Sequence, residues 1–325
     1  MKVLVVGGAG YIGSVTVDQL LQAEHSVTVV DSLVGGHREA VSREAEMVVG
    51  DVRDEDALGR LMASHSFDAV FCYGGYIQAG ESVLNPGRYF ANNVGGGIAL
   101  LNAMVAYGVG RFVFSSSAAV YGEPDSLPLT EEAPVRPVNP YGETKAMVER
   151  MLPWYERLAN IRYASLRYFN AAGATELRGE DHRPETHLIP IVLQTALGQR
   201  EAVSLYGTDY PTPDGTCIRD YVHVTDLAAA HILALERLEA GSGVYNLGSG
   251  SGFSNREVVE AARRVSGRPI AVRQEPRRAG DPARLVASNE MAKRALGWLP
   301  SVTSLEAIIE SAWRWHQAHP KGYPS

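Results

Sequence analysis

Two side chains at helical spacing could carry out proton transfer at neutral pH. Tyr141 and Lys145 stand four residues apart, which puts a phenol and an ammonium on one face of a helix. A free tyrosine has a pKa of about 10, too high for a good base at pH 7, but a nearby cation favours the phenolate and lowers that pKa. By itself the pair is more typical of an exposed helix surface, so further residues must support the interpretation.

A run of three serines gives the tyrosine a partner. Ser115, Ser116 and Ser117 follow an apolar stretch that predicts a strand over 111–115. The run therefore lies at the carboxyl edge of the sheet, where open α/β folds bind ligands. From there Ser117 can hydrogen-bond a substrate hydroxyl and relay its proton, whereas Ser115 fits better as the end of a serine-rich loop.

A glycine-rich turn near the amino terminus predicts a dinucleotide site. Gly7, Gly10 and Gly13 lie between an apolar strand and a helix, which lets the backbone approach a pyrophosphate at the helix N-terminus. Asp31 ends the second predicted strand, where a carboxylate can accept both ribose hydroxyls and would repel a 2′-phosphate. We therefore expect NAD rather than NADP. Asp51 ends the third predicted strand, near the adenine, although alone it is more typical of a turn.

These residues are positioned by a repeated strand–helix pattern in the first half of the chain. Continuous apolar strands alternating with amphipathic helices predict a doubly wound parallel sheet, the Rossmann class of α/β fold, with helices on both faces. Pro153 is expected to kink or break the last of these helices. The predicted strands cover 2–6, 27–31, 47–49, 69–73, 111–115 and 163–167, and the predicted helices cover 11–22, 54–64, 88–107 and 141–159.

The pattern changes after about residue 170, where loops lengthen and glycine and proline become frequent. Predicted helices over 188–198, 225–240, 255–266 and 304–318 alternate with short strands. We interpret 1–170 as an NAD-binding domain and 171–325 as a smaller C-terminal α/β substrate-binding part. The segment 224–240 is a candidate to return and pack on the first domain.

Composition narrows the class of protein further. The formal net charge of -7, from 30 basic and 37 acidic residues, argues against a general nucleic-acid binder. Cys72 and Cys217 are too few for a disulfide framework or a cysteine zinc site, so we expect a reducing cytoplasm and assign no metal ligands. No run approaches the ~20 apolar residues that span a bilayer, so no membrane partner is expected.

Seven segments carry a more specific pattern: 80–83, 92–94, 115–122, 139–142, 166–170, 209–216 and 219–224. The Tyr-Pro-Thr-x-Asp-Gly-Thr stretch at 210–216 is the most discriminating. With these segments the sequence resembles the UDP-glucose 4-epimerases of the extended short-chain dehydrogenase/reductase family over nearly its whole length. The resemblance implies that a UDP-hexose is oxidised transiently at carbon 4 through bound NAD, with a 4-keto intermediate. It also implies a homodimer formed through the helices over 88–107 and 141–159.

The same resemblance assigns residues to three roles. The catalytic positions are Ser117, Tyr141 and Lys145. The positions that match NAD contacts are Gly7, Gly10, Tyr11, Ile12, Gly13, Asp31, Ser32, Asp51, Val52, Tyr73, Gly74, Gly75, Asn92, Ser115, Tyr141, Lys145, Tyr168 and Phe169. Those that match UDP-sugar contacts are Ser117, Tyr141, Asn170, His187, Leu188, Ser204, Leu205, Tyr206, Arg219, Tyr221, Arg278, Asp281 and Leu285. Arginines suit a diphosphate through forked hydrogen bonds, although Arg219 or Arg278 taken singly is more typical of a surface ion pair.

Two other functions compete with this interpretation. A sugar-nucleotide dehydratase on the same fold needs an acid and a carboxylate beside the serine, but Ala118 and Ala119 follow Ser117 here and cannot do acid–base work. A non-catalytic NAD-binding or redox-sensing protein has no need of Ser117, Tyr141 and Lys145 together. The sequence therefore favours epimerisation over both.

The resemblance also places one residue at the edge of the sugar pocket. Leu285 follows the Arg-x-x-Asp segment that runs from Arg278 to Asp281, at a position where some family members have tyrosine. Tyrosine closes the pocket to an N-acetyl group, and leucine is smaller. Activity on UDP-N-acetylglucosamine and UDP-N-acetylgalactosamine is therefore expected as well. The alternative is that Leu285 packs in the core and another side chain fills the space.

Overall fold

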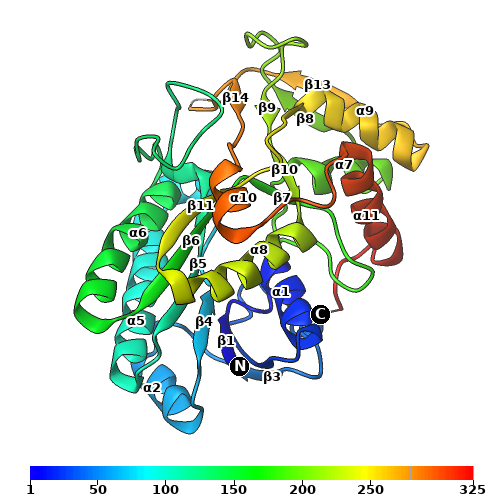
Figure 1. The fold of residues 1–325 in the computed structure, drawn as a ribbon. Helices are drawn as coiled ribbons and strands as arrows, with labels where there is room; N and C mark the ends of the chain where they lie inside the picture. Colours follow the sequence, from blue (N-terminus) through cyan, green and yellow to red (C-terminus); the bar gives the residue numbers. More distant parts are fainter. Residues whose placement is uncertain (279, 325) are drawn as a thin grey trace.

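Seven parallel strands form the central sheet of the computed structural model (Figure 1). The structure describes residues 1–278 and 280–324. The strands lie in the order β11-β6-β5-β4-β1-β2-β3. Their bounds are β1 (Lys2–Val6), β2 (Ser26–Asp31), β3 (Glu46–Val49), β4 (Ala69–Cys72), β5 (Arg111–Ser117), β6 (Arg162–Tyr168) and β11 (Gly243–Leu247). The prediction of a doubly wound parallel sheet is confirmed.

The order of the strands reverses beside β1, because β2 follows on one side and β4 on the other. In open α/β sheets such a reversal opens a crevice at the carboxyl ends of the strands, where ligands bind. The residues that follow β1 and β4 therefore meet at this crevice. They are the glycine turn that begins at Gly7 and the loop that begins at Tyr73.

Helices cover both faces of the sheet, because successive strand residues point to opposite faces (Figure 1). Val3 and Val5 pack with α1 (Tyr11–Gln22), α8 (Val224–Arg237) and α10 (Glu290–Leu296). Leu4 and Val6 pack on the other face. That face is covered by α2 (Glu55–Ser64), α5 (Gly96–Tyr107) and α6 (Pro140–Ala159).

Two predicted helices of the first half differ from the prediction. The helix expected over 88–107 consists of α4 (Pro86–Tyr89), a π-helical segment η2 (Phe90–Gly95) and α5. A short helix that was not predicted, α3 (Ala79–Leu84), precedes it. Pro153 lies inside an uninterrupted α6, so the predicted break is wrong. Pro153 lies on the exposed side of α6, next to the exposed Trp154.

The second half forms a smaller layer around its own core. The apolar faces of α7 (Leu188–Ala196), α9 (Asn255–Ser266) and α11 (Leu305–Ala318) meet there. Short strands pair beside them: β7 (Asn170–Ala172) with β10 (Tyr221–His223), β8 (Val203–Tyr206) with β13 (Val272–Glu275), and β12 (Phe253–Ser254) with β9 (Ile218–Arg219) and β14 (Arg284–Leu285). The four helices predicted for this half are confirmed apart from their ends. Among the described residues, no helix is long and apolar enough to cross a membrane.

Candidate active site

The glycine turn leaves no room for side chains. A Cβ on Gly7, which has a φ of +79°, would lie 2.5 Å from the backbone nitrogen of Gly74, and one on Gly13 would lie 2.3 Å from the carbonyl oxygen of Gly7. Gly10 is the N-cap of α1. As a glycine it has no side chain that could accept a hydrogen bond from the first N–H groups of the helix. The first N–H groups of α1, at Tyr11 and beyond, are thus available to an anion. This arrangement fits the pyrophosphate of a dinucleotide.

Asp31 lies beside this turn, at the end of β2. Its carboxylate accepts hydrogen bonds from the backbone N–H of Ala9, at 3.0 Å, and of Leu33, at 2.8 Å. Burial raises the pKa of Asp31 above its usual value, while both hydrogen bonds act in the opposite direction. Ser32, the next residue, is exposed. A carboxylate held at this place fits the ribose hydroxyls of the adenosine half.

The two residues expected near the adenine differ in their surroundings. Asp51 is half-buried and pairs with Arg53 at 2.5 Å, and hydrogen bonding from Arg53 lowers the pKa of Asp51. Val52 packs over the backbone of the α5 N-terminus, where a Cβ on Gly96 would lie 2.5 Å from its Cγ1. Val52 thus adds an apolar surface at this edge of the sheet, and Asp51 forms a local turn with Arg53.

The π-helical segment brings two asparagines to the loop after β4. Asn93 accepts from the backbone N–H of Tyr76 at 2.8 Å, and the side chain of Asn92 donates to Asn93 at 3.0 Å. A Cβ on Gly75 would lie 3.1 Å from Asn93 Oδ1. Tyr73, at the start of the loop, donates to Thr16 of α1 at 2.8 Å. A π-helical turn often occurs at a functional site, and here it holds Asn93 against the loop after β4.

Tyr141 stands in the first turn of α6. Asn139 is the N-cap, and its side chain accepts from the backbone N–H of Gly142 at 2.9 Å. Pro140 follows at the position where a missing N–H does no harm. The backbone N–H of Tyr141 is also bound, because it donates to the hydroxyl of Ser82 at 3.1 Å. The start of the helix, and with it the tyrosine, is therefore fixed from two sides.

Lys145 lies one turn further on and is almost fully buried, with 3% of its surface exposed. Its ammonium donates to the backbone carbonyl of Ser115 at 2.8 Å. Burial lowers the pKa of Lys145 to about 8. The pKa of Tyr141 is raised by burial, and the hydrogen bond to Ser117 only partly opposes this. Desolvation thus outweighs the other influences on the pKa of Tyr141, so the phenolate expected from the sequence requires further positive charge beside it.

The three serines point to different faces of β5, as alternation along a strand requires. Ser116 donates to Glu149 at 2.5 Å, inside the sheet–helix layer that also holds Arg167. Ser115 shares a short hydrogen bond with Tyr168 on the neighbouring strand. Ser117 accepts from the backbone N–H of Ala119 at 3.1 Å. Ser115 and Ser117 are therefore on the face expected to carry NAD and substrate.

The C-terminal part brings a second group of predicted residues together. Arg219 and Asp281 form an ion pair, and Arg219 also donates to the carbonyl of Pro282 at 2.9 Å. Leu285 pairs with Arg219 in the β9–β14 ladder. The side chain of Leu285 packs in the same apolar cluster as Phe169, which also contains the residue after Ser117. Leu285 is thus half-buried between the two groups of predicted residues.

Other predicted substrate residues lie on neighbouring strands. The guanidinium of Arg278 stands 3.8 Å from the ring centroid of Tyr206 on β8. Asn170 donates to the carbonyl of Asp220 at 2.9 Å, and burial raises the pKa of Tyr221. Ser204 is half-buried and Leu205 is buried in the strand that ends at Tyr206.

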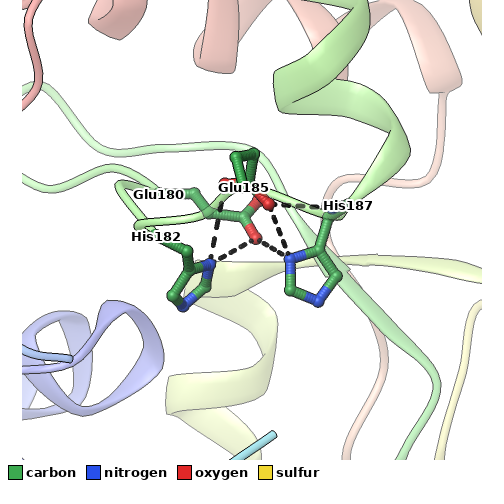
Figure 2. A group of neighbouring side chains, drawn as sticks. All are labelled: Glu180, His182, Glu185 and His187. Carbon is green, nitrogen blue, oxygen red and sulfur yellow. Dashed lines mark hydrogen bonds and ion pairs between the residues drawn. The ribbon is translucent and has the colours of Figure 1, made fainter. Parts of the chain in front are cut away.

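His187 and Leu188 begin α7, and here the structure shows a cluster that the sequence analysis missed. His187 caps the helix, and its Nδ1 lies 2.8 Å from Glu180 Oε1 and 3.0 Å from Glu185 Oε1 (Figure 2). His182 joins from the other side. The sequence does contain an indication of this cluster, because four side chains of a type that can bind metal ions lie within eight residues. The loop offers no helical or strand periodicity, so the spacing did not stand out.

The geometry agrees with what comparison with known proteins shows. Residues 3–248 match the model of the NAD dependent epimerase/dehydratase family. A UDP-glucose 4-epimerase of Halalkalibacterium halodurans is 51% identical over 327 residues, covering 99% of this chain and 98% of its own. A solved UDP-glucose 4-epimerase is 50% identical with a TM-score of 0.98, and each chain is covered completely. The Bifidobacterium longum UDP-glucose 4-epimerase, solved with NAD+ and UDP, is 37% identical with a TM-score of 0.95, covering 99% of this chain and 100% of its own.

Proposed function

This chain belongs to the NAD dependent epimerase/dehydratase family, and from that premise we propose that Ser117, Tyr141 and Lys145 form its catalytic set. The reaction is the NAD-dependent 4-epimerisation of UDP-glucose and UDP-galactose. The observation that supports the assignment is the meeting of the end of β5 with the first turn of α6. There a phenol, a hydroxyl and a buried ammonium stand at the carboxyl edge of a parallel sheet.

Tyr141 is the proposed base for the 4-hydroxyl of the hexose. NAD, when bound, accepts a hydride from carbon 4 and later returns it to the opposite face of the sugar. Ser117 hydrogen-bonds both Tyr141 and the sugar hydroxyl, and so relays the proton. Because burial raises the pKa of Tyr141, the phenolate needs nearby positive charge, and Lys145 is the cation of this helix face. The same phenol returns the proton when the keto sugar is reduced.

The proposed UDP anchor lies in the C-terminal part. Arg219 and Arg278 would bind the diphosphate, and Asp281 the ribose diol, by charge-assisted hydrogen bonds. Holding the nucleotide while the hexose turns lets hydride return to the other face. The remaining proposed substrate contacts are Asn170, His187, Leu188, Ser204, Leu205, Tyr206, Tyr221 and Leu285.

The proposed cofactor contacts surround the crevice beside β1. The glycine turn fits the pyrophosphate because Gly7 and Gly13 tolerate no Cβ. Asp31 fits the adenosine ribose, and a buried carboxylate there opposes a 2′-phosphate. The other proposed contacts are Gly10, Tyr11, Ile12, Ser32, Asp51, Val52, Tyr73, Gly74, Gly75, Asn92, Ser115, Tyr168 and Phe169.

The same proposal covers the organisation of the molecule. The division falls near residue 170, with 1–170 binding NAD and 171–325 binding the UDP-sugar, and α8 and β11 returning to the first part. A homodimer through α5 and α6 is supported by exposed apolar side chains on these helices: Val105, Tyr107, Trp154 and Leu158. Two buried free cysteines support a reducing, cytoplasmic location.

The activity is tested with UDP-galactose as the only substrate and a readout specific for UDP-glucose. The purified chain should convert one into the other without added reductant, because the reaction is redox-neutral overall. Loss of product in Tyr141→Phe with retained folding would support the catalytic set. Conversion that proceeds equally well in that variant would rule the set out, while the family and fold would stand.

A further inference from the structure

A partly buried cluster beside the proposed cofactor site, with two buried glutamates and two more exposed histidines, has the composition of a metal centre. Glu180, His182, Glu185 and His187 each turn one ligand-type atom toward a common point, and these atoms all lie within 4.8 Å of one another (Figure 2). We propose that these four side chains bind one divalent transition metal ion, with Zn²⁺ the best match. The function proposed above neither needs nor implies this ion.

The spacing of the ligand atoms agrees with tetrahedral coordination. Nitrogen and oxygen ligands at about 2.0–2.1 Å from Zn²⁺ lie about 3.3 Å from one another. Here Glu180 Oε1 lies 2.8 Å from His187 Nδ1 and 3.2 Å from His182 Nδ1. Glu185 Oε1 lies 3.0 Å from His187 Nδ1, and the other oxygen, Glu185 Oε2, lies 3.7 Å from His182 Nδ1. These four distances are close to the tetrahedral spacing, and all four ligand atoms lie within 4.8 Å of one another.

Two of the atoms are buried without a hydrogen-bond partner. Glu185 Oε1 accepts from the backbone N–H groups of Thr186, at 2.7 Å, and His187, at 2.8 Å. Among residues 1–278 and 280–324, Glu185 Oε2 has no hydrogen-bond partner, although only 3% of this side chain is exposed. Within the same residues His182 Nδ1 has none either, although Glu180 is close. An unpaired buried carboxylate oxygen is costly, and a cation at the common point would satisfy it.

Charge gives a further argument. Two carboxylates and two neutral imidazoles carry a net charge of -2, which a divalent cation neutralises. The competing state is a pair of imidazolium–carboxylate ion pairs. Although burial acts to lower both pKa values, interaction with the two glutamates raises the pKa of His182 to about 9 and that of His187 to about 10. Protons and metal therefore compete for the same nitrogens, and the experiment below separates the two states.

The position of the cluster indicates a structural role. Four protein ligands leave no open coordination position for a substrate. The His182 ring stands edge-on to that of Tyr11, with centroids 6.4 Å apart, and Tyr11 donates to the carbonyl of Gly173 at 2.5 Å. A bound ion would fix the loop between β7 and α7 against the first turn of α1. A cavity of about 280 Å³, lined by His182, Glu185 and the C-terminal segment, offers a route for entry.

Metal binding is measured on the full-length protein, independently of activity. The chain is stripped with a chelator, incubated with ZnCl₂ and dialysed, and zinc is counted by mass spectrometry. The same protein is titrated with CoCl₂, which absorbs visible light strongly only in a tetrahedral site. Glu185→Gln and His182→Gln each remove one ligand and keep the side-chain size. His65→Gln is the control, because His65 pairs with Glu46 on the surface at 2.9 Å.

The expected result is one zinc per chain in the wild type and in His65→Gln, with a visible cobalt band. Both ligand variants should bind at least about 100-fold more weakly. Circular dichroism shows whether each variant is folded. Wild-type protein that retains no zinc and shows no cobalt band would overturn the proposal, whatever the variants do. Equal binding in the wild type and in a folded Glu185→Gln would overturn it as well. Neither result bears on epimerase activity.

Discussion

The ammonium of Lys145 donates to the backbone carbonyl of Ser115 at 2.8 Å, so the buried cation of α6 is fixed to the end of β5. This bond joins the two elements that carry the proposed catalytic groups. Burial at the same place lowers the pKa of Lys145 to about 8 and raises that of Tyr141. Lys145 therefore loses its proton more readily than a free lysine, and Tyr141 loses its proton less readily than a free tyrosine.

Removing that ammonium should leave a smaller fraction of Tyr141 ionised at neutral pH. In Lys145→Met we expect kcat to fall by about 10²–10³-fold, and the acid limb of the pH–rate profile to move to higher pH, because the phenolate loses its nearest cation. Kinetics between pH 6 and 10 measure both effects. Arg150→Met removes an exposed cation of the same helix, which pairs with Glu143 at 2.8 Å, and should change neither. An unshifted profile in Lys145→Met would remove Lys145 from the proposed set.

Tyr141→Phe keeps the ring and removes the phenolic oxygen. Activity should fall by about 10²–10⁴-fold, the usual range for general acid–base catalysis, while the fold is retained. The matched control is Tyr155→Phe, which removes a phenol near the other end of α6 that donates to Asn102 at 2.8 Å. Near-normal turnover in Tyr141→Phe would show that Ser117 or another group carries the proton.

Leu285 gives a prediction about substrate size. It is half-buried and packs in the cluster that contains Phe169, so a larger side chain there should crowd the proposed sugar pocket. We expect the wild type to act on UDP-N-acetylglucosamine, and Leu285→Tyr to lower kcat/KM for the N-acetyl sugar far more than for UDP-glucose. Leu299→Tyr, at an exposed leucine, is the control. A wild type that ignores the N-acetyl sugars would show that Leu285 does not admit them.

His231 should weaken the fold in acid. Its ring is buried against Tyr73, its Nδ1 contacts the carbonyl of Leu227 at 2.8 Å, and burial lowers its pKa to about 4. Because the unfolded state takes up this proton first, the stabilisation is complete above pH 6.5 and is lost as the pH falls toward 4. The loss amounts to about 2–3 kcal/mol.

Urea unfolding at several pH values measures that loss. His231→Phe has no titrating ring, so its free energy of unfolding should fall less steeply between pH 6.5 and 4. A constant change caused by repacking does not affect the comparison, since only slopes are compared. Equal slopes in the two proteins would mean that His231 already takes up its proton in the folded state.

The local sequence predicts most of the first half because its signals are local. The apolar run before Gly7 and the spacing of Tyr141 and Lys145 depend only on the period of a strand or a helix. The partner of the Lys145 ammonium could not be predicted in this way, because Ser115 lies on another element. The effect of burial on the pKa of Tyr141 could not be predicted for the same reason, since burial depends on the whole fold.

The second half was harder to predict where strands are short. β11 completes the central sheet beside β6, although its sequence lies far along the chain and its first two residues are only half-buried. The residue pattern of a strand does not indicate which other strand it pairs with in the sheet. The cluster around Glu185 was missed because loop residues have no period that brings them together, and His187 had already been given a role.

The late return of β11 affects how the protein is made. Until β11 leaves the ribosome, β6 is an open edge strand, and such edges pair readily with other chains. The apolar core on one face of β1 is also incomplete until α8 and Trp298 have been translated. A nascent chain that ends at residue 170 therefore exposes both an unpaired strand and unfilled apolar surface. The NAD-binding half should need chaperones until nearly the whole chain has been translated, and it should not be expressible alone as a soluble fragment.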